Sequence, residues 1–157
     1  MSLQPLFEWM ESLAITAVLQ DLYVTAAFNL VHLLSMVVFA GAVLIVDLRL
    51  LGHGLTRQPL ARVARGAQPW LVGGLAGLVV TGIPAVMVTA MTQYLNPVFW
   101  FKMYFLLGGI IFAFTVRRKV TLADEARVAP FWAKVVGLTS IALWAVVAAT
   151  ARMIMLY

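Results

Sequence analysis

The side chain best suited to ligand chemistry in this chain is a histidine in the middle of a long apolar segment. His32 lies within residues 22–51, where the first charged residue is Asp47. An ionisable side chain inside a membrane-spanning helix is costly to bury and therefore marks a candidate functional site. An imidazole there could bind haem iron, or it could hydrogen-bond a Ser, a Thr or a carbonyl of a neighbouring helix.

Two cations and two thioethers are expected near the same end of the bundle as His32. Lys102 and Arg152 each lie about one helical turn inside an apolar segment, and Met87 and Met91 lie in the same half of another. The set resembles a haem b pocket, in which the imidazole ligates iron and the cations pair with the propionates. The cations could instead snorkel to the surface, and the methionines could fill the core. Aromatic walls for the macrocycle would be Phe28, Phe99 and Trp100.

The histidine count limits the ligation of such a site. The only other histidine, His53, lies 21 residues further on (53 − 32), roughly 31 Å away along a helix. One chain could therefore offer His32 with an open sixth position, or His32 with a methionine. A homodimer could supply two His32 side chains. Copper(I) bound by His32 and thioethers is the alternative cofactor. The candidate methionine ligands are Met87, Met91 and Met103.

Composition places these residues in a membrane protein. The chain has 157 residues, 64% hydrophobic and 11% charged, with a mean hydropathy of +1.00, whereas soluble domains are nearer a quarter charged. Cysteine is absent, which excludes a disulfide framework, a thiolate metal site and c-type haem attachment. The net charge of +5 is explained by orientation in a lipid bilayer, so nucleic acid is not an expected partner.

The apolar segments predict an all-α integral membrane protein, a four-helix transmembrane bundle forming one domain over residues 1–157. A short N-terminal interfacial helix is expected within residues 3–19, unless these form the first turns of a longer first span. Asp21 could cap the first span. The four spans are predicted at residues 22–50, 69–92, 98–116 and 131–156.

Proline and glycine give local expectations. Pro69 is expected in the first turn of the second span, and Pro84 is expected to kink that span near Val80. A turn is expected at residues 93–97. Glycines in the spans are expected to allow close helix contact; they are Gly41, Gly73, Gly77, Gly82, Gly108, Gly109 and Gly137.

The basic residues predict the orientation. Nine of the eleven Lys and Arg lie in or beside two connections, the one between spans one and two and the one between spans three and four. Basic connections stay cytoplasmic, so both termini are expected outside and His32 in the outer half of the bundle. Asp47 and Arg49 are expected to form an interfacial pair with loop arginines. The nine basic residues are Arg49, Arg57, Arg62, Arg65, Arg117, Arg118, Lys119, Arg127 and Lys134.

Five residues form a spacing pattern: His32, Gly41, Arg49, Gly82 and Lys102. The pattern resembles a family of small uncharacterised four-helix bacterial membrane proteins. That family is similar to the membrane domain of copper-resistance protein D and, more remotely, to the HemJ-type protoporphyrinogen oxidase. The resemblance covers about residues 22–118. It implies a bacterial inner-membrane protein with His32 as a haem b ligand and a functionally important Lys102. Porphyrinogen oxidation is not implied, because the longer basic motif after the first span is missing.

The sequence thus predicts an inner-membrane haem b protein that passes electrons between a quinone and an acceptor at the outer face. No catalytic residue is assigned, and whether the protein is an enzyme is left open. Two alternatives remain. One is a non-enzymatic accessory subunit of a larger membrane complex, held by the glycine-rich faces of the second and third spans. The other is a copper-handling membrane protein.

Overall fold

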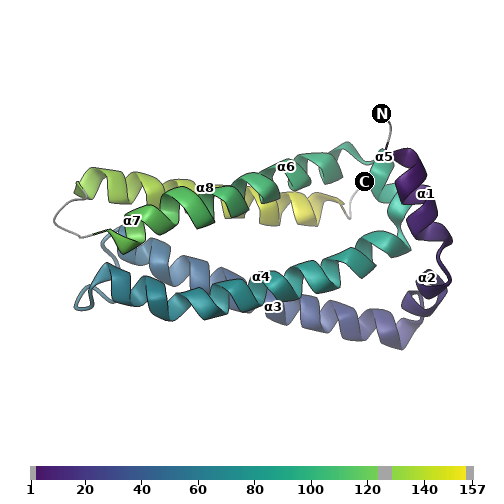
Figure 1. Cartoon of the computed structure of the whole chain (residues 1–157), viewed down its shortest axis with the longest axis horizontal. Coiled ribbons are helices and arrows are strands. Elements are labelled where there is room, and N and C mark those ends of the chain that lie inside the picture. The colour runs from purple at the N-terminus through teal and green to yellow at the C-terminus, as the bar shows by residue number, and fades with distance from the viewer. Residues whose placement is uncertain (1–2, 124–128, 155–157) are drawn as a thin grey trace.

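The protein is a bundle of helices (Figure 1). The computed structural model describes residues 3–123 and 129–154, and every regular element among them is helical. The fold class is therefore the predicted all-α bundle. In chain order the elements are α1 (Gln4–Ser12), α2 (Ala14–Leu19), α3 (Leu22–Leu50), α4 (Leu60–Val88), α5 (Ala90–Leu95), α6 (Pro97–Phe112), the π-helix η1 (Ala113–Arg117), α7 (Arg118–Leu122) and α8 (Pro130–Met153).

Four helical segments are long and apolar enough to cross a membrane: α3, α4, the continuous run Pro97–Leu122, and α8. The chain is therefore a multi-pass membrane protein. The first span, α3, has the predicted limits. The Asp21 carboxylate caps it as expected, accepting hydrogen bonds from the backbone N–H groups of Tyr23 at 2.9 Å and Val24 at 3.3 Å.

The second span begins nine residues earlier than predicted (69 − 60), at Leu60. Pro69 consequently lies inside α4 and not in its first turn. The reason is an apolar face hidden among arginines. Its members recur at intervals of three and four residues, which is the period of a helix face, and all four are buried; they are Leu60, Val63, Ala64 and Ala67.

At its other end, the second span stops earlier than predicted. Helix α4 ends at Val88, and Thr89 leaves the helical conformation with φ −131° and ψ 38°. The short helix α5 follows and occupies part of the turn predicted at residues 93–97. Pro84 has no N–H to donate to the carbonyl of Val80, which weakens this part of α4.

The third and fourth spans also differ at their ends. Helix continues past the predicted residue 116 as far as Leu122, through η1 and α7. The fourth span begins at Pro130, one residue before the predicted start. The predicted end of that span at residue 156, like loop residue Arg127, lies outside the described residues.

The N-terminal segment forms two short helices where one was expected. Leu13 separates α1 from α2 with an extended backbone, φ −67° and ψ 136°. A continuous extension of the first span is wrong, because α2 ends at Leu19 and Asp21 starts α3 anew. Helix α1 contacts α4 and α5 and covers one end of the bundle (Figure 1).

The spans pack as two pairs, α3 with α4 and α6 with α8, and α3 also contacts α8. Some glycines allow close approach, as expected. A Cβ on Gly74 would lie 2.8 Å from the backbone nitrogen of Phe39, one on Gly77 would collide with Ser35, and one on Gly109 would touch Trp144. The packing expectation is wrong for three others, where a Cβ would meet nothing within 4 Å; these are Gly41, Gly73 and Gly108.

The buried core is divided into two clusters. The larger lies at the end of the basic connections and contains residues of α3, α4 and α8, Phe39 and Val46 among them. The smaller lies at the opposite end, where Phe7 of α1 packs against Ala90 and Phe99. The level of His32 on α3 falls between the two clusters. In Figure 1 the two helix pairs diverge towards the end that α1 and α5 cover.

Candidate functional site

His32 lies half-buried near the middle of α3 and faces α4. Its ring nitrogen Nδ1 is 2.7 Å from the hydroxyl oxygen Oγ1 of Thr81. Thr81 is 3% exposed, and its hydroxyl also hydrogen-bonds the main-chain carbonyl oxygen of Gly77, one turn earlier, at 2.6 Å. The ring is thus tied to the second span through a buried hydroxyl.

This pair of contacts assigns the protons. A hydroxyl has one hydrogen to donate, and a carbonyl oxygen can only accept. We therefore assign Thr81 as the donor to Gly77 and as the acceptor from Nδ1–H of His32. In the neutral imidazole the other nitrogen, Nε2, then carries the lone pair. A ligand histidine in metalloproteins is commonly held in this way, with one nitrogen hydrogen-bonded and the other free to bind.

Two further residues complete the surroundings of the ring. A Cβ on Gly82 would lie 3.8 Å from Cε1 of His32, so Gly82 is in direct register with the imidazole. Lys102, half-buried on α6, lies within electrostatic range of His32. The third span therefore contributes a cation to the electrostatic surroundings of the ring.

Of the other predicted site residues, Met91 lies in the smaller core cluster, as does Trp100. Arg152 lies exposed in the last turn of α8. Met87 is half-buried on α4, six residues after Thr81 (87 − 81). Phe28 lines a small cavity between α3 and α4, one turn before His32. The structure therefore brings Lys102 within electrostatic range of His32 and places Met91 with the core packing.

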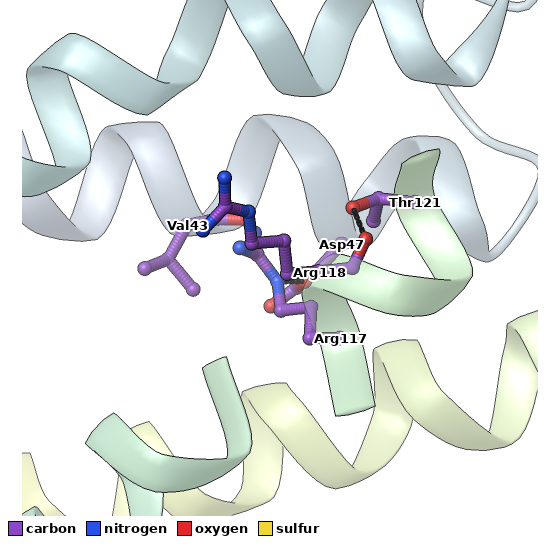
Figure 2. A network of polar contacts seen from close by, with 5 residues as sticks. All are labelled: Val43, Asp47, Arg117, Arg118 and Thr121. Atoms are coloured by element: carbon purple, nitrogen blue, oxygen red, sulfur yellow. Dashed lines mark hydrogen bonds and ion pairs between the residues drawn. The ribbon is translucent and has the colours of Figure 1, made fainter. Parts of the chain in front are cut away.

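A second polar centre lies further along α3, at the end of the basic connections. Asp47 is 0% exposed and Arg117 is 5% exposed. Nε of Arg117 donates to Oδ1 of Asp47 at 2.7 Å, and Nη2 donates to the carbonyl oxygen of Val43 at 3.0 Å (Figure 2). The expected pairing of Asp47 with a loop arginine is confirmed for Arg117, but the pair lies buried inside the bundle and not at the interface. Nε of Arg49 donates to the carbonyl oxygen of Gln58 at 3.1 Å.

The π-helix η1 positions the arginine of this pair. A π turn holds one more residue than an α turn and so rotates the residues that follow it about the helix axis. Arg117 is the last residue of η1 and is buried against α3, while the next residue, Arg118, is exposed. Thr121 anchors the following turn by donating to the carbonyl oxygen of Arg118 at 3.2 Å (Figure 2).

Helix α8 closes the second centre. A Cβ on Gly137 would lie 3.2 Å from the carbonyl oxygen of Asp47, so glycine permits this approach. Ser140 is 0% exposed and lies beside the Asp47 carboxylate. Within the described part of the chain, Oδ2 of Asp47 and Oγ of Ser140 meet no partner at hydrogen-bonding distance and angle. Among the described residues, the ion pair therefore satisfies one carboxylate oxygen, and the other has the Ser140 side chain beside it.

Sequence reasoning missed Thr81, and it placed Arg117 among the loop arginines expected to pair with Asp47 and not inside the bundle. Thr81 lies 49 residues from His32 (81 − 32) in an apolar helix, and nothing local distinguishes it from a threonine that bonds its own helix. Arg117 had a usable signal. It stands at the same predicted depth as Asp47 and has the opposite charge, and two such residues at the edges of adjacent spans are candidates for an intramembrane pair.

Comparison with known proteins shows the family of the chain. Residues 6–157 match DUF6644, described as a family of unknown function. No curated protein and no solved structure matches. The match covers nearly the whole chain, so this protein belongs to the DUF6644 family.

Proposed function

We propose that this member of the DUF6644 family is a haem b protein that transfers electrons within a membrane. The iron ligand is Nε2 of His32. Lys102 pairs with a propionate, and the chain exchanges electrons between a membrane quinone and an acceptor at the outer face. When bound, haem b supplies one-electron redox chemistry. The spacing of His32, Gly82 and Lys102 supports a ligand arrangement shared with the HemJ-type oxidase, without its porphyrinogen chemistry.

The observation that carries the proposal is the contact of His32 with Thr81. This contact is the hydrogen bond to a neighbouring threonine that the sequence offered as the alternative to iron ligation, and it uses only one of the two ring nitrogens. Here Nδ1 is bonded to a hydroxyl whose own proton is committed to Gly77. That arrangement fixes the ring orientation and leaves the nitrogen needed for iron unprotonated.

The packing near His32 bears on whether a macrocycle fits. The cavity lined by Phe28 and Pro84 has a volume of about 210 Å³, below the roughly 300–1,000 Å³ of ordinary small-molecule sites. Neither His32 nor Lys102 lines this cavity, so haem b bound at His32 would have to occupy space beside it, at the level between the two core clusters. The donor set suits haem at this level, because a neutral imidazole and an ammonium group complement iron and a propionate.

The orientation belongs to the same proposal. The residues that flank the α3–α4 connection are rich in arginine, as are those after η1. If these ends face the cytoplasm of a bacterium, both termini face outward and His32 lies in the outer half of the inner membrane. Arg117 still counts towards this bias although it is paired with Asp47, because the rule counts Lys and Arg and not net charge.

An absorption spectrum of the purified protein tests the proposal. Protein from haem-replete cells should show a Soret band, and His32→Ala should abolish it. His53→Ala is the matched control, because His53 is exposed in the connection after α3 and should leave the band unchanged.

A colourless wild-type preparation would overturn the haem proposal. If such a preparation retained other membrane subunits, it would support an accessory subunit, and retained copper would support copper handling. Loss of the band in both histidine variants would also count against a specific ligand role for His32.

A further inference from the structure

A groove runs along the surface of the bundle between α3 and α4, in the half that holds Asp47. Its volume is about 510 Å³, and its walls are mostly apolar. The exposed side chains of Val37 and Trp70 lie on it at one end, and Gln58 and Arg62 lie at the end next to the α3–α4 connection. A long apolar channel with a cation at its interfacial end matches the outline of a lipid.

Two glycines form the floor of this groove, one on each helix. Gly41 and Gly66 both line it, and a Cβ on either would meet nothing within 4 Å. Neither glycine is therefore needed for contact between α3 and α4. Each keeps open a space that almost any other residue would fill.

The connection between the helices is shaped around the same groove. Leu55 adopts φ 44°, a left-handed conformation that is strained for a residue with a bulky side chain. Leu55 nonetheless lines the groove. The connection is held in place where Arg49 donates to the carbonyl oxygen of Gln58 at 3.1 Å. The strain places an apolar side chain where the groove meets the interface.

We propose that this groove binds an anionic phospholipid, with an acyl chain between α3 and α4 and the phosphate at Arg62. The charge selects this occupant. Arg57 and Arg65 also lie near this end, and basic pockets between membrane helices recognise anionic lipid head groups. A neutral quinone could accept a hydrogen bond from the guanidinium group, but it would gain no charge pairing. The proposal is independent of haem at His32.

Lipid retention by native mass spectrometry tests it. The purified full-length protein in detergent is titrated with dioleoylphosphatidylglycerol or dioleoylphosphatidylcholine. The phosphatidylglycerol should bind more tightly. Arg62→Gln should weaken phosphatidylglycerol about fivefold, the effect of about one surface cation, and should leave phosphatidylcholine unchanged. Arg65→Gln is the matched control, because Arg65 lies outside the groove lining and should have a smaller effect.

A variant that fills the groove distinguishes the contribution of the acyl chain to binding from that of the head group. Gly41→Leu should weaken both lipids, whereas Gly108→Leu on α6, which also faces open space, should weaken neither. Equal binding of the two lipids by the wild type would overturn the proposal, as would equal effects of Arg62→Gln and Arg65→Gln. A homodimer that Gly41→Leu dissociates would overturn it as well, because the groove would then be an interface between copies.

Discussion

The His32 centre and the Asp47 centre lie on the same helix, 15 residues apart (47 − 32), which is roughly 22 Å along α3. Both join α3 to another span through a side chain. At Asp47 the carboxylate is 0% exposed and bonded to a guanidinium that is also buried. At His32 a half-buried ring makes one hydrogen bond and keeps a nitrogen available.

The difference shows which centre stabilises the fold and which is suited to a ligand. A buried carboxylate depends on its arginine, because removing either partner leaves an uncompensated charge. Thr81 does not depend on His32, because its hydroxyl keeps Gly77 as an acceptor. The Asp47 centre therefore acts as a lock that joins the first span to the third. At the His32 centre, the free ring nitrogen could bind a ligand at little cost to the stability of the fold.

The largest expected effect is at the lock. Arg117→Ala leaves Asp47 charged and unpaired and should lower the free energy of unfolding by about 3–5 kcal/mol. Chemical unfolding in detergent micelles, followed by circular dichroism, measures this. Arg118→Ala is the control, because Arg118 is exposed, and its effect should stay within about 0.5 kcal/mol. Equal losses in the two variants would remove the distinction between the centres.

The next effect concerns the orientation of the histidine. Thr81→Val removes the acceptor of Nδ1–H and should lower the affinity for haem b about 10–100-fold, as loss of such supporting bonds does at metal sites. Titration of haem-free protein with haem measures it. Thr115→Val is the matched control, because Thr115 is exposed at the opposite end of the bundle and its hydroxyl donates to the carbonyl oxygen of Ile111 in its own helix. An unchanged affinity in Thr81→Val would contradict the proton assignment.

A smaller effect is expected when His32 is removed and the stability of the protein is measured without haem. His32→Ala should lower the free energy of unfolding by about 0.5–1.5 kcal/mol, the net value of one hydrogen bond. The same unfolding measurement gives the comparison with Arg117→Ala. A loss as large as that of Arg117→Ala would mean that His32, too, stabilises the bundle.

The smallest effect is expected beside the imidazole. In Gly82→Ala the new methyl lies 3.8 Å from Cε1 of His32, an ordinary contact, so stability should change by less than about 1 kcal/mol. Gly74→Ala is the contrasting variant, because its Cβ would lie 2.8 Å from the backbone nitrogen of Phe39 and should cost about 1–3 kcal/mol. Thermal unfolding of both variants checks the ranking.

The spans themselves were predictable, and their ends less so. Residues 22–50 were correct because a capping aspartate marks the start of the span and the charged residues Asp47 and Arg49 mark its end. The start of α4 was missed because the mean hydropathy of this stretch is lowered by arginines that lie between its buried apolar residues. The third span was cut short at residue 116 because an arginine was taken to end it, whereas in the structure that arginine is buried as part of the span.

Of the candidate site, only His32 was predictable from the sequence. An isolated histidine in an apolar helix draws attention by itself. The contact of His32 with Thr81 and the pairing of Asp47 with Arg117 both depend on how the helices are rotated about their axes. No residue pattern predicts the π turn that rotates Arg117 towards α3. Gly41 was expected to pack against a helix, and its open surroundings became visible only with the neighbouring helix in place.

The sequence by itself determined that this is a four-span helical membrane protein, because apolar segments of this length must satisfy their backbone hydrogen bonds as helices in a bilayer. It also determined where the isolated histidine and the basic connections lie along the chain. Only the tertiary structure decided which side chains meet. Depth follows from position along a helix, but contact also requires the rotation and the pairing of the helices, and these are set by packing between residues far apart in the chain.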